Sequence, residues 1–273
     1  MRFVVVPQWQ GSGSSRAMRL SEGAIAIQGD LPASSTTVVD VPLGAGEPLG
    51  TGVARFSSLR IVRDRLAEAL AGSSEPAIVI GGDCGVELAA VEHVVRRDGS
   101  APALVWLDAH PDLGAVDGAR PRAFGGTVAR AILGDGADGL TADPPLPAQH
   151  LVLAGVRSID DDERELIEEQ GIRTIPVQEL GGGALAEAVA ATGARSVYVH
   201  IDLDVLDPGV LASVADPQPF GVGLAELVAE LRALVTRFPL AGAGIAMFSP
   251  EGPDSAGEDL PTILRVLSAL TAA

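Results

Sequence analysis

The sequence predicts an α/β protein built on one doubly wound, largely parallel sheet of about eight strands. Short apolar segments alternate with segments of helical spacing along almost the whole chain. Most of the short segments are continuously apolar, which is typical of strands that helices cover on both faces. With 273 residues and no convincing linker, we expect a single domain over residues 1–273.

The first half of the chain opens with a predicted strand at 2–6, which ends at Pro7. The Gly- and Ser-rich segment 8–31 is expected to be a loop with at most a short helix. The elements predicted next are a strand at 36–43, a helix at 57–71, a strand at 77–80, a helix at 86–97, a strand at 103–107 and a helix near 126–133.

The second half continues the same alternation. Its predicted elements are a strand at 151–156, a helix around 161–170, a strand at 174–177, a helix around 184–191, a central strand from 196, a helix at 224–237, a strand at 242–248 and a closing helix at 259–271. Because strands linked by helices run parallel, their carboxyl ends should meet at one edge of the sheet.

Composition excludes several classes of function. The formal net charge of −17 disfavours nucleic acid and anionic membranes as partners, and no apolar run is long enough to span a membrane. The N-terminus lacks the features of a signal peptide, so we expect a cytoplasmic protein. A single cysteine excludes an internal disulfide framework.

The central strand carries the most informative pattern. Apolar residues occupy every second place from Val197 to Val205, so His200, Asp202 and Asp204 should share the opposite face. Carboxylates packed along a buried strand repel one another unless a cation lies between them. A solvated acidic turn is the alternative that this strand alone leaves open.

Two other strand ends carry similar residues. The three sets are Asp83-Cys84, Asp108-x-His110-x-Asp112 and Asp202-x-Asp204. Neighbouring strands lie about 4.8 Å apart, so side chains from adjacent ends can converge. Carboxylates, an imidazole and a thiol in one place predict a site for two divalent cations.

The same residues carry a family resemblance. Gly-Gly-Asp-Cys at 81–84, Asp-Ala-His-Pro-Asp at 108–112 and His-Ile-Asp-Leu-Asp-Val-Leu-Asp-Pro at 200–208 resemble the signature blocks of the ureohydrolases, the family of arginase, agmatinase and formiminoglutamase. Gly-Val-Arg-Ser at 155–158, followed by Glu163, is similar to a weaker block between them. The resemblance covers the chain from about residue 77 to residue 250.

The resemblance implies a three-layer α/β/α fold and a binuclear site, usually of manganese. One ion would be held by the residue at 84, Asp108, Asp112 and Asp202, and the other by His110, Asp108, Asp202 and Asp204. It further implies that a hydroxide bridging the ions attacks a guanidinium or formimino carbon, with Asp112 as a catalytic residue. A homo-oligomer, trimeric or hexameric, acting on a small-molecule substrate is also implied.

The sequence departs from the family at two important positions. Cys84 stands where the family usually has a histidine ligand, so the site could prefer Zn, Fe, Co or Ni to Mn, unless Cys84 remains a buried thiol that binds no ion. Met247 stands where a glutamate helps to hold the guanidinium, and Glu251 is out of register to replace it. We therefore expect a substrate other than plain arginine or agmatine.

The loop after Asp112 departs as well. Phe124 is the nearest match to the family's proton-shuttle histidine. Arg120 and Arg122 could bind a substrate carboxylate, or could simply be solvated. His200 is expected to be either a partner of a metal ligand or a core histidine bonded to backbone, and Trp106 a packing residue.

These features favour a metal-dependent hydrolase of a non-peptide C–N bond in a linear amidine, guanidino or formimino compound. The alternative is a catalytically idle family member that binds metal and serves a structural or regulatory role. The preserved ligands favour the enzyme, because holding several carboxylates together is costly and an idle site gains little from it.

Overall fold

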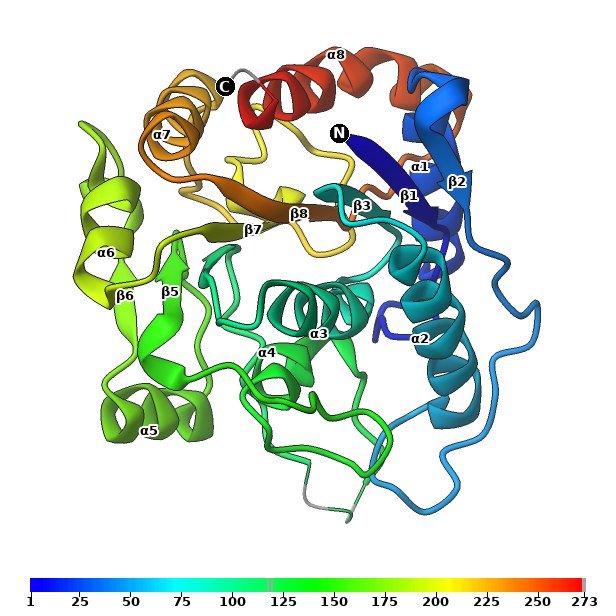
Figure 1. Ribbon diagram of the computed structural model, residues 1–273. Helices are drawn as coiled ribbons and strands as arrows, with labels where there is room; N and C mark the ends of the chain where they lie inside the picture. Colours follow the sequence, from blue (N-terminus) through cyan, green and yellow to red (C-terminus); the bar gives the residue numbers. More distant parts are fainter. Residues whose placement is uncertain (117, 119, 272–273) are drawn as a thin grey trace.

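The computed structural model describes residues 1–116, 118 and 120–271, and the other positions of the predicted domain, 117, 119 and 272–273, lie outside the description. The described residues form one sheet of eight parallel strands and eight α-helices (Figure 1). The strands are β1 (Arg2–Val6), β2 (Thr36–Val38), β3 (Ala77–Gly81), β4 (Ala103–Leu107), β5 (Leu151–Ala154), β6 (Arg173–Ile175), β7 (Val197–Asp202) and β8 (Leu240–Ala246). The helices are α1 (Met18–Gln28), α2 (Phe56–Ala71), α3 (Glu87–Asp98), α4 (Val128–Ile132), α5 (Asp161–Gln170), α6 (Ala184–Thr192), α7 (Leu224–Arg237) and α8 (Pro253–Leu270).

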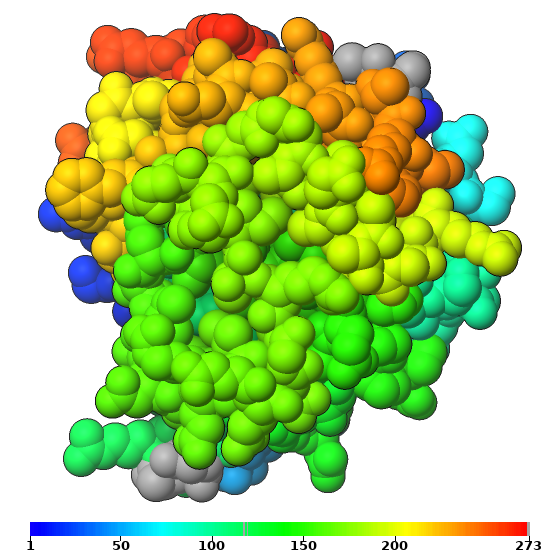
Figure 2. Space-filling view, turned by 90° about the vertical axis from the view of Figure 1, so that its left-hand side faces the viewer, coloured from blue at the N-terminus to red at the C-terminus, as the bar shows by residue number. Residues whose placement is uncertain are grey.

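The sheet lies between two layers of helices, which confirms the predicted three-layer α/β class. Helices α2, α3, α4 and α5 pack on one face, and α1, α6, α7 and α8 pack on the other. In Figure 1, α7 and α8 lie above the sheet and α2, α3 and α4 below it. Figure 2 shows the molecule from the β6 side, where the segment from β5 to α6 covers the edge of the sheet.

Both faces of the sheet are apolar because both are covered. In β1, for example, Val4 and Val6 enter the core beneath α2 and α3, while Val5 enters the core on the opposite face. All three side chains are fully buried. This explains why the strands appear in the sequence as continuous apolar runs.

The strand order is β2-β1-β3-β8-β7-β4-β5-β6. The predicted acidic strand ends therefore follow β3, β7 and β4, three of the four central strands, and β8 lies between β3 and β7. In the paired register, Leu107 of β4 faces Ile201 of β7, so the next residues, Asp108 and Asp202, leave the sheet side by side.

Several boundaries differ from the predictions. Helix α1 occupies much of the segment predicted as loop, and α8 begins at Pro253, six residues before the predicted start. The predicted strand at 36–43 ends at Val38. The central strand ends at Asp202 and is followed by a 3-10 helix, Leu203–Val205, so Asp204 does not continue the strand. None of the described helices combines the length and apolar composition needed to cross a membrane.

Candidate metal centre

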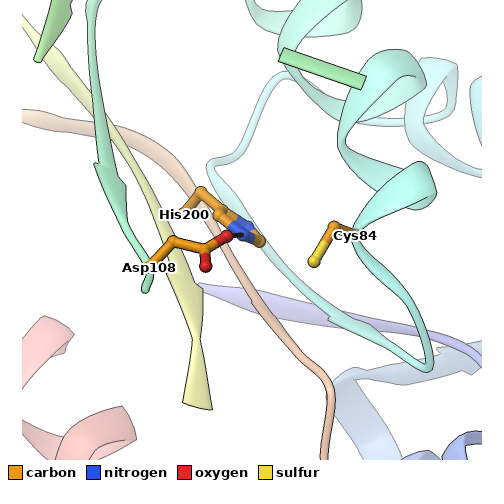
Figure 3. Close-up of side chains that lie close together, drawn as sticks. All are labelled: Cys84, Asp108 and His200. Atoms are coloured by element: carbon orange, nitrogen blue, oxygen red, sulfur yellow. Dashed lines mark ion pairs between the residues drawn. The ribbon is translucent and has the colours of Figure 1, made fainter. Parts of the chain in front are cut away.

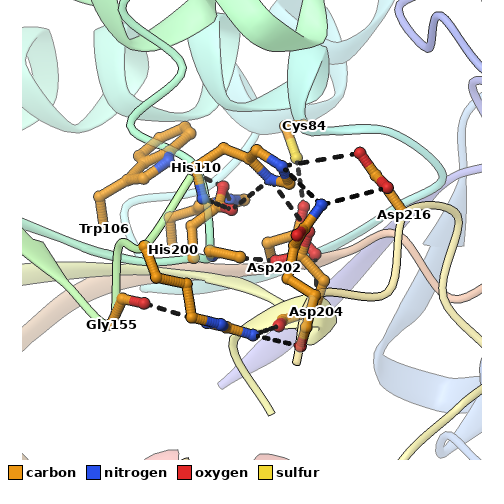
Figure 4. A network of polar contacts seen from close by, with 12 residues as sticks. Cys84, Trp106, His110, Gly155, His200, Asp202, Asp204 and Asp216 are labelled. Carbon is orange, nitrogen blue, oxygen red and sulfur yellow. Dashed lines mark hydrogen bonds and ion pairs between the residues drawn. The ribbon is translucent and has the colours of Figure 1, made fainter. Parts of the chain in front are cut away.

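The acidic residues that follow β4 and β7 meet around one imidazole. His110 Nδ1 lies 3.1 Å from Asp204 Oδ2 and 3.5 Å from Asp108 Oδ1 (Figure 4). Asp204 reaches this position because its own backbone N–H donates to Asp202 Oδ1 at 2.8 Å, which closes the turn after β7. The other Asp204 oxygen, Oδ1, accepts the backbone N–H of Ala109 at 3.0 Å. One ligand atom from each of Asp108, His110 and Asp204 lies within 4.8 Å of the others.

A second group forms where β3 ends. The Cys84 thiol donates to Asp202 Oδ2 at 3.2 Å. Cys84, Asp108 and His200 each place one ligand atom within 4.8 Å of the other two (Figure 3). Asp108 therefore belongs to both groups, which is the position expected of a residue shared between two ions. These three side chains and that of Asp202 are all buried.

Asp112 lies at the same cavity but outside these two groups. Its backbone has a φ of 53°, a left-handed conformation that aspartate tolerates better than most residues. Its carbonyl oxygen accepts the backbone N–H groups of Ala129 and Arg130 at the start of α4. Its Oδ2 atom is buried and has no hydrogen-bond partner among the described residues. The residue is thus fixed by backbone contacts while its carboxylate stays free.

Asp83, which shares the strand end with Cys84, has a different role. Its two oxygens accept the Gln8 side-chain amide and the backbone N–H groups of Gly11 and Gly85, all at 2.8 Å. Burial raises its pKa to about 6, although these hydrogen bonds oppose the shift. Asp83 therefore holds the loop after β1 against the start of α3.

Burial dominates the electrostatics of the carboxyl groups. It raises the pKa of Asp108 to about 6, with Asp204 adding to the effect. It also raises the pKa of Asp112 and of Asp202 well above the ordinary range, and the neighbouring carboxylates act in the same direction. Burial, followed by the charge of Asp202, likewise raises the pKa of the Cys84 thiol. The charged forms of all four groups are therefore unfavourable unless positive charge is nearby.

His110 supplies positive charge in direct contact with Asp108 and Asp204. The Arg157 guanidinium, which donates to the Asp204 carbonyl oxygen at 2.7 Å, adds a second positive charge. Burial opposes protonation of the His110 ring, but contacts with Asp108 and Asp204 outweigh burial and raise its pKa to about 12. His110 in turn lowers the pKa of Asp204 against the effect of burial. These two positive charges cannot balance four buried acids.

The donor set fits divalent cations. Carboxylate, imidazole and thiolate are all metal ligands, and together they suit Zn²⁺, Co²⁺ or Fe²⁺ as well as Mn²⁺. Three buried atoms in the cluster have no hydrogen-bond partner in the described residues, namely Asp112 Oδ2, Asp204 Oδ2 and His200 Nε2. Buried polar atoms are normally paired, so these atoms are available for a cation.

A cavity of about 450 Å³ opens onto the cluster. Its buried lining includes Cys84, Asp112, Asp202 and Asp204, and its exposed rim includes Asp160 and Asp216. Glycine-rich segments 11–13 and 125–126 form the walls. All the predicted ligands except Asp108 thus line a pocket large enough for a small molecule.

Comparison with known proteins defines the family. The arginase-family profile matches residues 11–258. The chain belongs to the arginase family. It is 27% identical over 266 residues to the N(omega)-hydroxy-L-arginine amidinohydrolase of Streptomyces lavendulae, covering 95% of this chain and 90% of that protein.

Solved structures show the same fold. The arginase of Entamoeba histolytica in complex with L-ornithine matches with a TM-score of 0.88 and 20% identity, over 100% of this chain and 98% of that one. The proclavaminate amidino hydrolase of Streptomyces clavuligerus matches with a TM-score of 0.72 and 25% identity, over 98% and 91% of the two chains. The predicted family, fold and ureohydrolase-like enzyme class are confirmed.

Met247 and Phe124, two residues that we expect to depart from the family pattern, lie beside the cluster. Met247 lines the cavity directly after β8, with a φ of 71°, and its backbone N–H donates to Gly82 O at 2.8 Å. Glu251 is exposed and pairs with Arg19, away from this cavity. Phe124 is buried, and its ring packs close to the Cα of Gly85, next to Cys84.

The two predicted arginines occupy different environments. Arg122 lines the cavity rim, where its guanidinium lies 3.4 Å from Asp162 Oδ2 and 3.8 Å from Asp160 Oδ2. Arg120 is exposed and is not among the described residues that line the cavity, so the geometry gives no support to its predicted role in substrate binding.

The sequence interpretation missed two contributors, Trp106 and Asp216, and left the role of His200 open. Trp106, expected to be a packing residue only, donates its indole N–H to Asp108 Oδ2 at 3.0 Å. His200 contacts a buried glutamate, Glu87, and not backbone. Asp216 lies with its Oδ2 3.6 Å from His110 Nε2. Because side chains two residues apart in a strand share a face, the sequence could have placed Trp106 beside Asp108. The contacts of His200 with Glu87 and of Asp216 with His110 join residues that are distant in sequence.

Proposed function

We propose that this protein is a metal-dependent hydrolase that cleaves a non-peptide C–N bond in a linear guanidino or amidine compound. The convergence of Cys84, Asp108, His110, Asp202 and Asp204 carries the proposal, and all of them except Asp108 line one cavity. The family supports the same class of reaction. No observation favours the alternative of an idle family member, because the buried acids are costly without a function.

We assign the ligands as the motifs suggested. The first ion would be held by Cys84, Asp108, Asp112 and Asp202, and the second by His110, Asp108, Asp202 and Asp204. Divalent ions bound there would supply a Lewis acid and would lower the pKa of water enough to provide a nucleophile near neutral pH.

Asp112 is the residue that we assign to proton handling. Its free Oδ2 faces the cavity lining, and its backbone is held in place by the start of α4. While one carboxylate oxygen binds the ion, Oδ2, which has no hydrogen-bond partner among the described residues, would be available to accept a proton. In this role Asp112 would orient the attacking water and later return the proton to the leaving nitrogen.

Met247 supports a substrate that is less basic than a plain guanidinium. A cationic group that reached this side of the cavity would meet a thioether where a carboxylate is expected, at a cost on the order of 3 kcal/mol in a desolvated site. An N-hydroxyguanidine fits better, because its electron-withdrawing hydroxyl lowers the basicity. The Streptomyces lavendulae relative is named for N(omega)-hydroxy-L-arginine, which carries that group.

The cavity rim supports an amino-acid end on the substrate. Asp160 and Asp216 are exposed carboxylates that could bind an ammonium group. Arg122 could bind a carboxylate by exchanging its ion pairs with Asp160 and Asp162, which are worth about 1 kcal/mol or less each, while Nη1 keeps its hydrogen bond to the Ala115 carbonyl oxygen. The rim thus offers both charges of a zwitterion.

The experiment is a metal analysis followed by a turnover screen. Protein purified without added ions is assayed for metal, then for urea, hydroxyurea and ammonia release from arginine, agmatine, N(omega)-hydroxy-L-arginine and formimino compounds. We expect two ions per chain and a kcat/KM at least tenfold higher for the hydroxyguanidine than for arginine. Asp202→Asn should be inactive, while Glu251→Gln, outside the cavity, serves as the matched acidic control.

Two outcomes would contradict the proposal. A protein that takes up no divalent metal and turns over none of these compounds is not such a hydrolase. Turnover of plain arginine or agmatine at an ordinary enzyme rate, about 10 s⁻¹ or more, would overturn the substrate class.

The thiol of Cys84 supports a preference for Zn²⁺, Co²⁺, Fe²⁺ or Ni²⁺ over Mn²⁺. The family also suggests a homo-oligomer, which light scattering would test.

A further inference from the structure

His200 is held in one orientation by a buried carboxylate. Its Nδ1 lies 3.0 Å from Glu87 Oε1, and both side chains are fully buried. A carboxylate accepts hydrogen bonds, so Nδ1 is the nitrogen that carries hydrogen. In the neutral ring, Nε2 then presents a lone pair. The pairing with Glu87 therefore leaves Nε2 able to bind a cation.

The free nitrogen is aimed at the cluster. Nε2 has no hydrogen-bond partner among the described residues and lies 3.9 Å from Asp108 Oδ2. Together with Cys84, these residues place three ligand atoms within 4.8 Å of one another (Figure 3). Ligands around one tetrahedral zinc ion lie about 3.5 Å apart, so small side-chain adjustments would bring all three onto one ion.

Neighbouring residues hold His200 and Glu87 in these positions. The Trp106 ring lies against the imidazole with ring centroids 3.7 Å apart, and its indole N–H fixes Asp108 (Figure 4). The second oxygen of Glu87 accepts the Tyr198 hydroxyl at 2.5 Å. Gly244 in β8 leaves room for Glu87, since a Cβ there would lie 1.6 Å from Glu87 Oε1.

We propose that His200, through Nε2, is a ligand of the ion held by Cys84 and Asp108, and that Glu87 is the residue that positions it. The proposal rests on the metal-dependent function proposed above. A carboxylate that binds the distal ring nitrogen raises the basicity of a histidine ligand and fixes its tautomer, as in many zinc sites. His200 would thereby supply the imidazole that position 84 lacks, from β7, which β8 separates from β3.

Cobalt substitution separates the two ions. We expect wild-type protein to bind two Co²⁺ ions, with a thiolate-to-cobalt charge-transfer band from Cys84. His200→Gln should lower the affinity of one ion by at least tenfold and shift that band. Glu87→Gln, which keeps a hydrogen-bond acceptor but removes the charge, should lower the same affinity by about tenfold. His150→Gln, at a histidine that contacts only Pro102 O, should change neither property.

A second measurement does not depend on how the variants fold. Nitrogen-15 NMR of the four histidine rings in wild-type protein, with and without Zn²⁺, reports which ring nitrogens bind metal. We expect the His200 Nε2 resonance to move to the metal-bound range while Nδ1 keeps its proton. An unchanged His200 signal in zinc-loaded protein, or a His200→Gln variant with wild-type affinity and cobalt spectrum, would overturn this inference alone. A wild-type protein that binds no metal would overturn the proposed function as well.

Discussion

Replacing Asp108 by asparagine measures how much the buried acids destabilise the metal-free fold. Asp108 is fully buried, and burial followed by the charge of Asp204 raises its pKa from 3.8 to about 6. A carboxyl group whose pKa rises on folding destabilises the folded state wherever it is ionised in both states. The difference of about 2 pH units corresponds to about 3 kcal/mol.

The sign of the pH dependence follows from proton binding. Between about pH 4 and pH 6 the folded state keeps the Asp108 proton that the unfolded state has lost, so stability falls as the pH rises through this window and then levels off. Trp106 Nε1 donates to Asp108 Oδ2 and the His110 backbone N–H donates to Oδ1, so the single amide oxygen of Asp108→Asn can keep only one of these two bonds. The donor that loses its acceptor offsets about 1–3 kcal/mol of the gain. We expect this variant to be up to about 2 kcal/mol more stable than wild type at pH 8, and no more stable than wild type at pH 4.5.

Urea unfolding of chelator-treated protein at pH 4.5, 6 and 8 measures the difference. Asp216→Asn, a change at an exposed rim carboxylate, is the control and should alter the free energy of unfolding by no more than about 0.5 kcal/mol. Added metal should reverse the order, because ions bind the folded wild type and Asp108 is one of the proposed ligands. A difference between Asp108→Asn and wild type that is the same at all three pH values would refute the reasoning.

Three further experiments test individual residues. Met247→Glu should raise arginine or agmatine hydrolysis at least tenfold, whereas Met247→Gln should not; equal rates in both variants would show that Met247 does not face the reacting group. Cys84→His should shift competitive binding from Zn²⁺ towards Mn²⁺, and identical selectivity would mean that Cys84 binds no ion. Asp202→Ala should remove both ions and Asp204→Ala mainly one, measured by metal content after dialysis; full loading of Asp202→Ala would contradict the shared-ligand assignment.

The convergence of the acidic strand ends was predictable because it depends on topology alone. Parallel strands joined by helices place their carboxyl ends at one edge, so Asp108 and Asp202 had to lie near each other once their strands paired. The simple alternation expected to carry Asp204 along the strand was wrong in detail. After Asp202 the chain forms a 3-10 helix. The hydrogen bond from the Asp204 backbone N–H to the Asp202 carboxylate, and not the strand pleat, directs Asp204 to the cluster.

Other features depend on long-range contacts that the hydrophobic periodicity of the sequence does not predict. The segment that contains α1 was expected to be loop, with room for a short helix, because of its glycine and serine content. The helix has 11 residues, and Gly23 lets it pack closely on the backbone of Phe248. The pairing of Glu87 with His200 joins residues 113 positions apart. Only the assembled sheet, with Gly244 opening space between them, brings these two side chains together.

The distribution of unpaired buried atoms bears on whether the site is functional. Among the described residues, five buried side-chain atoms lack a hydrogen-bond partner, and three of them, Asp112 Oδ2, Asp204 Oδ2 and His200 Nε2, belong to this one cluster. Each unpaired buried polar atom costs about 1–3 kcal/mol, and the raised pKa values of Asp108, Asp112 and Asp202 add to that cost. A fold that served only a structural role would lower its energy by replacing these residues with apolar ones. Their concentration around a 450 Å³ cavity is what a site completed by bound cations requires.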